Sequence, residues 1–335
     1  MAFIKILHLH KYYQKEDKIA VDDFSLDIEQ NERIVIVGPS GCGKTTLLHM
    51  LAGILPSDQG SIFMDGKDIT TLAANKRDIA MVFQDQALFP HLSVEENIAF
   101  GLAYQGHTKE WIDQEVDQVL KDLHLEDVKG RKTCTLSGGQ AKRVALARAF
   151  VRHAKIILMD EPLSSLDANL REEFRHFILT YHAKHPCTLL YVTHDQREAM
   201  SMASRIVVMK DAKIAQVDTP MNIYQHPNTM FVASFIGSYG MNFIPKDSIM
   251  VGIRPESFTM KEKKDTYSLL VRVLYRECFG DRFLYVCKYQ DVILKALLSE
   301  CIDTESLTLY VSKDAVLYFD SQSGKRFLHS FDMQL

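Results

Sequence analysis

A glycine-rich segment at residues 38–46, GPSGCGKTT, constrains the fold of this chain more than any other feature. It contains G-x-x-x-x-G-K-T, a phosphate-binding loop, which is meaningful only between a strand and a helix. An apolar run at 33–37 precedes the segment and a helix-like run at 46–52 follows it. Both parts of the required context are therefore present. The segment predicts a parallel α/β sheet that holds phosphate groups at the edge of the sheet.

Each residue type in this loop has a physical role in holding a triphosphate. Glycines let the backbone turn its N–H groups toward phosphate oxygens, and the positive end of the following helix faces the same anion. Lys44 supplies a charge between the β- and γ-phosphates, and the Thr45 hydroxyl is placed to bind Mg²⁺. The alternative is a glycine-rich turn in an ordinary strand–helix unit. The predicted nucleotide-binding residues of the loop are Gly38, Pro39, Ser40, Gly41, Cys42, Gly43, Lys44, Thr45 and Thr46.

A second strand-like run, at 156–159, ends in two carboxylates. Asp160, at the tip of a parallel strand beside the phosphate loop, can hold Mg²⁺ through its water shell. Glu161, one residue further on, can polarise a water molecule for in-line attack on the γ-phosphate. An isolated Asp-Glu-Pro sequence could simply end a strand and turn the chain. After a phosphate loop, it predicts a site that hydrolyses ATP.

Residues 136–140 read LSGGQ, and together with the phosphate loop and the IILMDEP strand they make the chain resemble the ATP-binding subunits of ABC transporters. The resemblance covers nearly the whole chain. It identifies Gln84 as the Q-loop glutamine, which can contact Mg²⁺ and water, and His194 as the switch histidine, which can sense the γ-phosphate. A solvated loop amide and a surface histidine are the alternatives. The resemblance also identifies residues 164–167 as the D-loop and adds Asp167 to the nucleotide-binding residues.

Two adjacent tyrosines are candidates for the aromatic residue that stacks on adenine. The resemblance favours Tyr13 for this role. Tyr12 is adjacent, and either tyrosine could instead be a strand aromatic packed in a core.

The LSGGQ segment opens a predicted helix, because apolar residues recur at helical spacing after it. A serine followed by two glycines would leave exposed N–H donors at the helix start, which makes a second anion site. The resemblance implies a head-to-tail homodimer that encloses two ATP molecules, each between one phosphate loop and the opposite LSGGQ segment. A glycine-rich helix cap is the alternative. On the dimer interpretation, the partner's nucleotide is bound by Ser137, Gly138, Gly139 and Gln140.

Length, net charge and the pattern of apolar residues limit the functions and cellular locations that we expect for this chain. The 335 residues suggest two domains. The net charge of −4 argues against nucleic acid as the main partner, which disfavours the ABC ATPases of DNA repair and translation. No stretch approaches the ~18 apolar residues needed to span a bilayer, and the N-terminus does not resemble a signal peptide. We therefore expect a cytoplasmic protein, peripheral on the inner face of the membrane, with free thiols at its 6 cysteines.

The predicted fold is an α/β P-loop NTPase of the ABC type with a small second domain. Residues 1–236 would form the cassette, a RecA-like core with a helical subdomain at about 88–151. Residues 237–335 contain short alternating runs typical of an antiparallel barrel. This region, with its GIRPE segment at 252–256, resembles the TOBE/OB-like regulatory barrel of import ATPases. The barrel could sense a ligand or only hold the dimer together.

Taken together, the sequence predicts the ATPase subunit of a bacterial ABC importer that uses ATP and Mg²⁺. Its partners would be transmembrane permease subunits, docked near residues 87–91, and indirectly a periplasmic or lipoprotein solute-binding protein. An ordinary apolar patch buried within the domain is the alternative for Leu88 and Phe89. Residues 235–243 favour sugar or glycerol-phosphate import, whereas residues 83–94 fit polyamine or ferric-iron importers equally well. A non-transport ABC ATPase is a further alternative. The residues do not identify the transported molecule.

Overall fold

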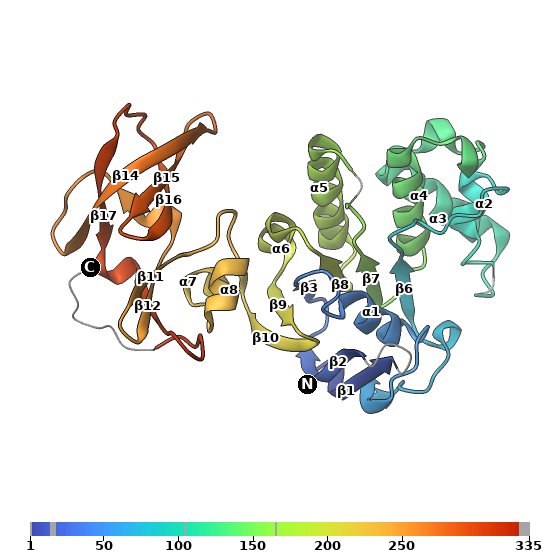
Figure 1. Ribbon diagram of the computed structural model, residues 1–335. Coiled ribbons are helices and arrows are strands. Elements are labelled where there is room, and N and C mark those ends of the chain that lie inside the picture. Colours follow the sequence, from blue (N-terminus) through green and yellow to red (C-terminus); the bar gives the residue numbers. More distant parts are fainter. Residues whose placement is uncertain (1, 14–17, 104, 165, 328–335) are drawn as a thin grey trace. The chain divides into compact units, whose positions relative to one another are not determined.

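The computed structural model describes residues 2–13, 18–103, 105–164 and 166–327. The chain divides into two compact units, Met1–Pro220 and Met221–Leu335 (Figure 1). The division lies after Pro220 rather than after residue 236, where the sequence analysis placed it. Each unit has its own hydrophobic core.

A six-stranded sheet forms the centre of the first unit, in the order β10-β9-β3-β8-β7-β6. All neighbours pair in parallel except β10, which is antiparallel to β9. Parallel strands are covered on both faces and therefore consist of nearly continuous apolar runs; β7 and β8 are buried along their whole length. The strands are β3 (Arg33–Val37), β6 (Ile79–Val82), β7 (Ile156–Asp160), β8 (Thr188–Thr193), β9 (Arg205–Lys210) and β10 (Lys213–Asp218).

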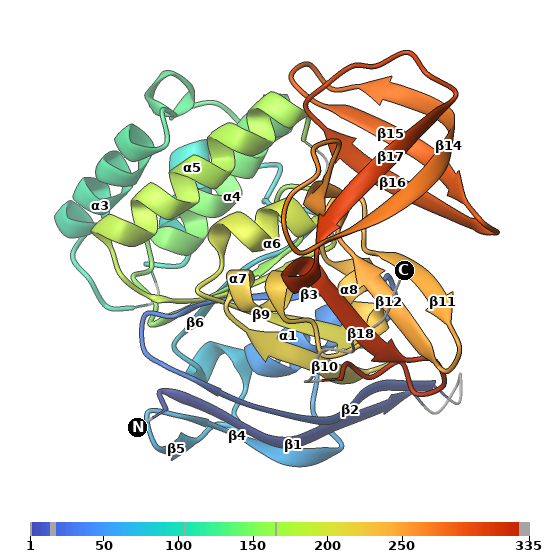
Figure 2. The ribbon, with the colours of Figure 1, turned by 90° about the vertical axis from the view of Figure 1, so that its left-hand side faces the viewer.

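A smaller antiparallel sheet, in the order β2-β1-β4-β5, completes the core of this unit. The helix α1 (Lys44–Ala52) contacts strands of both sheets, as Figure 2 shows. Its apolar residues Leu47 and Leu48 are fully buried. The phosphate loop is thus placed between two sheets by the packing of the helix that follows it. The strands are β1 (Ile4–Tyr13), β2 (Lys18–Ile28), β4 (Gln59–Met64) and β5 (Lys67–Asp68).

The region predicted as helical contains α2 (Val94–Ala99), α3 (Lys109–Asp122) and α4 (Gly138–Phe150). Short 3₁₀ turns occur at Ala74–Lys76, Glu126–Val128 and Thr133–Thr135. The unit also contains α5 (Ala168–Lys184) and α6 (Gln196–Met202); α6 contacts β3 and β8 of the central sheet, and α5 contacts α6. In α3, Val116, Val119 and Leu120 recur at helical spacing and are buried. Among the described residues, no helix combines the length and the apolar character needed to cross a bilayer.

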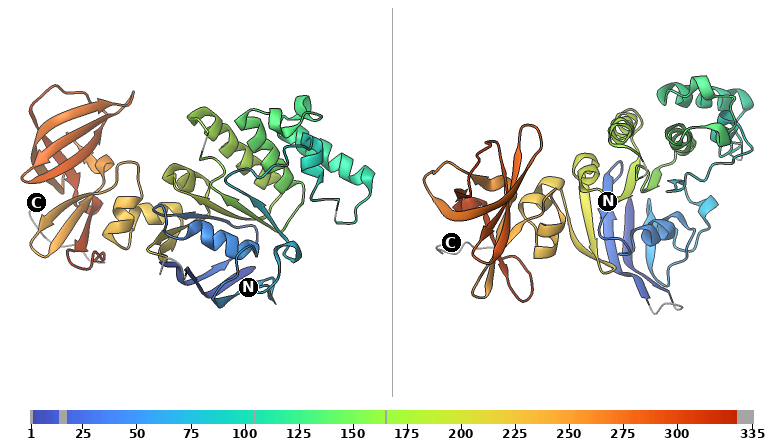
Figure 3. Two further views of the ribbon diagram at one scale, coloured as in Figure 1. Left: turned by 45° about the vertical axis from the view of Figure 1, so that its right-hand side comes forward. Right: turned by 45° about the horizontal axis from the view of Figure 1, so that its top comes forward.

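The second unit consists of two antiparallel sheets and two short helices, α7 (Pro220–Gln225) and α8 (Met230–Phe235) (Figure 3). The predicted antiparallel β domain is therefore present, with helices added at its start. The three-stranded sheet has the order β11-β12-β18 and the five-stranded sheet the order β13-β17-β14-β15-β16. The strands are β11 (Asn242–Lys246), β12 (Ile249–Ile253), β13 (Phe258–Thr259), β14 (Thr266–Cys278), β15 (Phe283–Tyr289), β16 (Val292–Leu298), β17 (Ser306–Ser312) and β18 (Val316–Asp320), with 3₁₀ turns at Pro255–Ser257 and Lys313–Ala315.

Arg254 of the GIRPE segment explains why the two short helices belong to the second unit. Its guanidinium is buried and donates hydrogen bonds to the carbonyl oxygens of Ala233 (2.9 Å), Ile236 and Tyr224 (2.9 Å). It also lies 4.2 Å from the centre of the Tyr224 ring, a cation–π contact. These bonds satisfy carbonyl groups of the helical segment that would otherwise be buried without donors. The GIRPE segment therefore has a structural role in joining α7 and α8 to the barrel.

Candidate functional site

The parallel strands place several predicted site residues at one edge of the central sheet. Val37, the last residue of β3, pairs with Thr193 of β8, and Asp160 of β7 pairs with Val192. The phosphate loop, Glu161 and His194 follow directly after these strands. Because carboxyl ends of parallel strands meet at one edge, residues far apart in the sequence converge there.

Backbone geometry makes glycine necessary at two positions of the phosphate loop. Gly43 has φ +102°, and a Cβ atom there would lie 1.9 Å from the carbonyl oxygen of Ala20. At Gly38, a Cβ atom would lie 2.4 Å from the carbonyl oxygen of Met209. Both contacts are shorter than atoms allow, so no larger residue fits. Gly43 is the N-cap of α1 and offers no side-chain cap, and the first N–H groups of a helix have no partner within the helix, so they can bind an anion.

Lys44 directs its charge into this loop. Its side chain is 6% exposed, and Nζ donates hydrogen bonds to the carbonyl oxygens of Gly38 (2.9 Å) and Pro39 (3.0 Å). Oγ1 of the neighbouring Thr45 donates a hydrogen bond to Oδ1 of Asp160 at 3.1 Å. The ammonium group of Lys44 and the hydroxyl group of Thr45, from consecutive residues at the start of α1, thus lie beside the carboxylate of Asp160 at the end of β7.

Asp160 and Thr45 have the chemistry that Mg²⁺ requires. Asp160 is 3% exposed, and burial raises the pKa of its carboxyl group, while the Thr45 hydrogen bond and the charges of His49 and Lys44 lower it. A bound cation would stabilise the ionised form that burial disfavours. Among the described residues, no cluster of three or more His, Cys, Asp or Glu side chains could hold a metal by itself. Phosphate oxygens and water would have to complete the shell, as is usual for Mg²⁺.

A cavity of about 260 Å³ lies in front of the phosphate loop. Tyr13 is among the lining residues, whereas the hydroxyl group of Tyr12 is bonded to Nδ1 of His10 at 3.1 Å. This arrangement favours Tyr13 over Tyr12 as the aromatic available to a base. Gln84 is exposed in the turn after β6 and does not line the cavity. The lining residues are Tyr13, Ala20, Ser40, Gly41, Gly43, Lys44, Thr45, Thr46 and Glu161.

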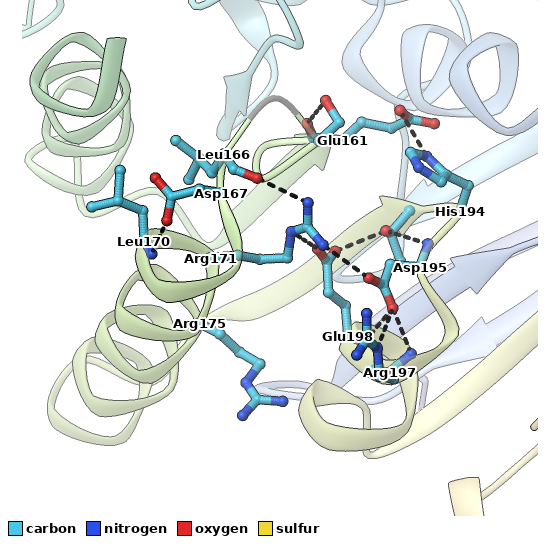
Figure 4. A network of polar contacts seen from close by, with 12 residues as sticks. Glu161, Leu166, Asp167, Leu170, Arg171, Arg175, His194, Asp195, Arg197 and Glu198 are labelled. Carbon is cyan, nitrogen blue, oxygen red and sulfur yellow. Dashed lines mark hydrogen bonds and ion pairs between the residues drawn. The ribbon is translucent and has the colours of Figure 1, made fainter. Parts of the chain in front are cut away.

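The carboxylate of Glu161, which lines this cavity, contacts the imidazole ring of His194 (Figure 4). Oε2 of Glu161 lies 3.1 Å from Nδ1 of His194. Glu161 has an unusual positive φ of 45°, and its backbone N–H donates to the carbonyl oxygen of Val192 at 3.0 Å. The backbone therefore turns out of β7 at this residue, which brings the carboxylate toward the cavity. A carboxylate held by an imidazole in this way can accept a proton from a water molecule.

The LSGGQ residues form a regular helix cap. Oγ of Ser137 accepts a hydrogen bond from the N–H of Gln140 (3.3 Å), and Oε1 of Gln140 accepts one from the N–H of Ser137 (3.1 Å). This capping box starts α4. Gly138 has open space around it, and Gly139 lies near the side chain of Leu170. None of the four predicted signature residues lines the phosphate-loop cavity of this chain.

The D-loop residue Asp167 also has a structural role. It caps α5, and its carboxylate accepts hydrogen bonds from the N–H groups of Asn169 (3.1 Å) and Leu170 (3.0 Å). Ser165, which was part of the predicted D-loop, lies outside the described residues. Within the described part of the loop, the hydroxyl group of Ser164 donates a hydrogen bond to the carbonyl oxygen of Glu161 at 3.0 Å. This bond connects the D-loop to the backbone of the candidate general base.

Cys42 provides a chemical test of the loop. Its thiol is buried, Sγ lies 3.9 Å from Nζ of Lys44, and burial raises the pKa of the thiol. We expect a maleimide to react slowly with Cys42, to block ATP binding once attached, and to be excluded by saturating ATP. The measurement is binding of a fluorescent ATP analogue in a variant whose exposed cysteines, Cys134, Cys278 and Cys301, are serine. Full ATP turnover after complete labelling would contradict the assignment.

Known proteins resemble this chain over most of its length. The model of the "ABC transporter" family matches residues 21–164. The chain is 51% identical over 352 residues to the oligosaccharides import ATP-binding protein MsmX of Bacillus subtilis (strain 168), covering 99% of this chain and 96% of MsmX. The chain belongs to the ABC transporter family. This ABC chain is also 44% identical over 330 residues to the multiple sugar-binding transport ATP-binding protein MsmK of Streptococcus mutans, covering 92% of this chain and 88% of MsmK.

A solved structure supports the same assignment. It is a dimer of the ATP-binding cassette MJ0796 in a post-hydrolysis state with ADP and Pi, with a TM-score of 0.59 and 28% identity, covering 65% of this ABC chain and 98% of that chain. The predicted family, the ABC cassette fold with a C-terminal β domain and the ATPase class are confirmed.

Sequence reasoning missed a set of charged residues behind the candidate site. Arg171, Asp195 and Glu198 are connected by ion pairs, and Figure 4 shows them next to His194 and the D-loop. The segment HDQRE does place Glu198 one helical turn after His194. That spacing was the available signal, although it could not identify a partner on another helix.

Proposed function

We propose that this chain is the ATPase subunit of a bacterial sugar importer of the oligosaccharide type, peripheral on the cytoplasmic face of the membrane. The observation that carries the proposal is the convergence of Lys44, Thr45 and Glu161 on one cavity, with Asp160 behind it. The sugar class is supported by the names of the two relatives, at 51% and 44% identity. The alternatives from the sequence, glycerol-phosphate, polyamine and ferric-iron import, differ only in the transported solute.

The chemistry of ATP hydrolysis can be assigned to individual groups. Lys44 and the free N–H groups of α1 would bind the β- and γ-phosphates, and Tyr13 would stack on the adenine ring. Thr45 and Asp160 would hold Mg²⁺, with Gln84 joining after a shift of its loop; the ion neutralises phosphate charge when bound. Glu161 would accept a proton from the attacking water. His194 would hold the Glu161 carboxylate in place through its Nδ1 atom, 3.1 Å away.

We infer that two copies act as a head-to-tail dimer. Ser137, Gly138, Gly139, Gln140 and Asp167 do not line this chain's own cavity, which fits a role at the partner's nucleotide. The similarity to a dimeric cassette structure supports this arrangement. In such a dimer the free N–H groups at the start of α4 would face the γ-phosphate, which the positive end of the helix dipole would stabilise.

A largely apolar groove of about 740 Å³ is the proposed docking site for a permease helix. It is lined by Ala87 and Phe89 from the segment after Gln84, with Phe89 and Phe100 only 4.5 Å apart between ring centres. Ile54, which is 49% exposed, also lines the groove, and contiguous exposed apolar surface often marks a binding site. Leu88, Pro90 and His91, which the sequence analysis included in the groove, do not line it.

The experiment that tests this function is reconstitution of the full chain in vesicles with a permease pair and its solute-binding protein. We expect an oligosaccharide-loaded binding protein to stimulate ATP turnover, and Ile54→Asp to abolish the stimulation while leaving the basal turnover unchanged. Stimulation only by a polyamine, ferric-iron or glycerol-phosphate system would contradict the sugar class. Turnover that no permease alters would favour the non-transport alternative.

A further inference from the structure

A cluster of four charged side chains lies behind the switch histidine. Arg171 comes from α5, Asp195 caps α6, Glu198 lies in α6 and Lys142 comes from α4. Glu198 and Lys142 are each 4% exposed. The side chains of Arg171 and Asp195 are partly exposed, at 29% and 18%. The buried carboxylate of Glu198 is paired with the guanidinium of Arg171, and pairing is the condition under which a buried charge is tolerated.

Hydrogen bonds through Glu198 and Thr193 connect the residues on both sides of His194. Oε2 of Glu198 accepts hydrogen bonds from the hydroxyl groups of Tyr191 and Thr193, both at 2.7 Å. The N–H of Asp195 donates to Oγ1 of Thr193 at 3.0 Å. We call residues 193–195 the switch segment. Its position is therefore set by the buried carboxylate of Glu198.

Arg171 joins the switch segment to the D-loop (Figure 4). Its Nη2 donates to the carbonyl oxygen of Leu166 in the D-loop at 2.9 Å. Its Nη1 lies 3.4 Å from Oδ2 of Asp195, and its Nε lies 3.8 Å from Oε1 of Glu198. One planar guanidinium thus reaches three groups in fixed directions, which a lysine cannot do.

One hydrogen-bond donor of Arg171 is unsatisfied, which suggests that the guanidinium can shift to a second position. Its Nε is buried and, within the described residues, has no hydrogen-bond partner, as is also true of Nζ of Lys142. Buried donors without partners are unfavourable and rare. A small displacement of Leu166 would let the guanidinium close on Glu198, which would give Nε of Arg171 a hydrogen-bond partner and shift the switch segment with it.

We propose that Arg171 is a positioning residue that couples the D-loop to His194, and through His194 to the carboxylate of Glu161. The inference rests on the proposed roles of Glu161 and His194. Arg171 is not among the residues that line the phosphate-loop cavity. Its effect is therefore on the chemical step, through the orientation of His194, and not on the binding of ATP.

The test compares three variants of the full chain in basal ATP turnover. We expect Arg171→Gln to lower kcat by up to about 10²-fold, the effect of a misplacement of roughly 1 Å, with KM for ATP within about twofold. Arg171→Lys keeps the positive charge but not the planar guanidinium with its donors in fixed directions, so we expect kcat to recover only in part. Arg175→Gln is the matched control, because Arg175 lies one turn further on α5 and donates to Oγ of Ser201 at 2.8 Å, without contacting the switch segment. Its turnover should stay within about twofold of wild type.

A double-mutant cycle separates positioning from a general structural effect. If Arg171 acts through the histidine, Arg171→Gln has no further effect on kcat in a His194→Ala background. Equal effects of Arg171→Gln in both backgrounds overturn the inference and leave the proposed function intact. Wild-type turnover of His194→Ala alone overturns the proposed role of His194, and the inference with it. If Arg171→Gln does not fold in a thermal unfolding assay, Asp195→Asn weakens the same bridge from the other end and must show the same non-additivity.

Discussion

The Glu161→Gln variant is expected to bind ATP with unchanged affinity and to hydrolyse it roughly 10²–10⁴-fold more slowly, because this is the rate contribution typical of a general base. The amide has the shape of the carboxylate but cannot accept a proton from water. The backbone of Glu161 is held by its bond to the carbonyl oxygen of Val192 at 3.0 Å, so the substitution should leave the loop in place. The measurements are phosphate release and binding of a fluorescent ATP analogue.

The same variant tests the dimer. With hydrolysis blocked, ATP should trap two copies in the closed arrangement, which light scattering would detect as a doubled mass. A suitable control is Glu172→Gln, which removes one charge from an exposed position on α5. Turnover of Glu161→Gln at the wild-type rate would exclude its role as base. Loss of turnover without ATP-dependent dimers would leave the base assignment standing and contradict the shared site.

Gly43→Ala should abolish ATP binding. The methyl group would lie 1.9 Å from the carbonyl oxygen of Ala20, at a φ of +102° that alanine avoids. The backbone must then move, and the N–H groups at the start of α1 lose their common direction. Strain of this kind costs about 1–3 kcal/mol, and the clash adds to it. Binding of the fluorescent analogue and the free energy of unfolding from urea titration are the measurements.

The Gly66→Ala variant separates the two causes of the effect expected for Gly43→Ala, which are the strain of a positive φ and the clash with Ala20. Gly66 has a comparable φ of +75°, but a Cβ atom added there would have no neighbouring atom within 4 Å. The variant should lose only about 1 kcal/mol of stability and keep full ATP binding. If Gly43→Ala binds ATP as well as Gly66→Ala does, the loop does not depend on its close contact with Ala20.

The sequence predicted the phosphate loop and the strand ends well because these are local properties. A glycine such as Gly43, followed by Lys44 and Thr45, needs only its own strand and helix to become a site. The placement of Asp160 and Glu161 followed from one further rule, that parallel strands end at a common edge. The S-x-x-Q spacing of Ser137 and Gln140 also contained the capping box that the structure shows.

Other features depend on residues that meet only in the folded chain. Arg171 and Lys142 share one cluster although they belong to different helices, and no periodicity connects them. Arg254 brings α7 and α8 into the second unit through bonds to backbone carbonyl groups, which any residue can offer and no pattern marks. The exposed position of Gln84 likewise depends on how the turn after β6 leaves the sheet.

Arg148 gives the docking groove a mechanical connection to the other end of α4. From the last turn of that helix, it donates hydrogen bonds to the carbonyl oxygens of Ala87 (2.6 Å) and Gln86 (2.9 Å). Gly138 starts the same helix, roughly 15 Å away at 1.5 Å per residue. A permease that pushes on residues 86 and 87 would therefore tilt α4 as a stiff lever. Transport and closure of the nucleotide site would then be coupled by a rigid-body tilt of α4, without any change in the internal structure of the helix.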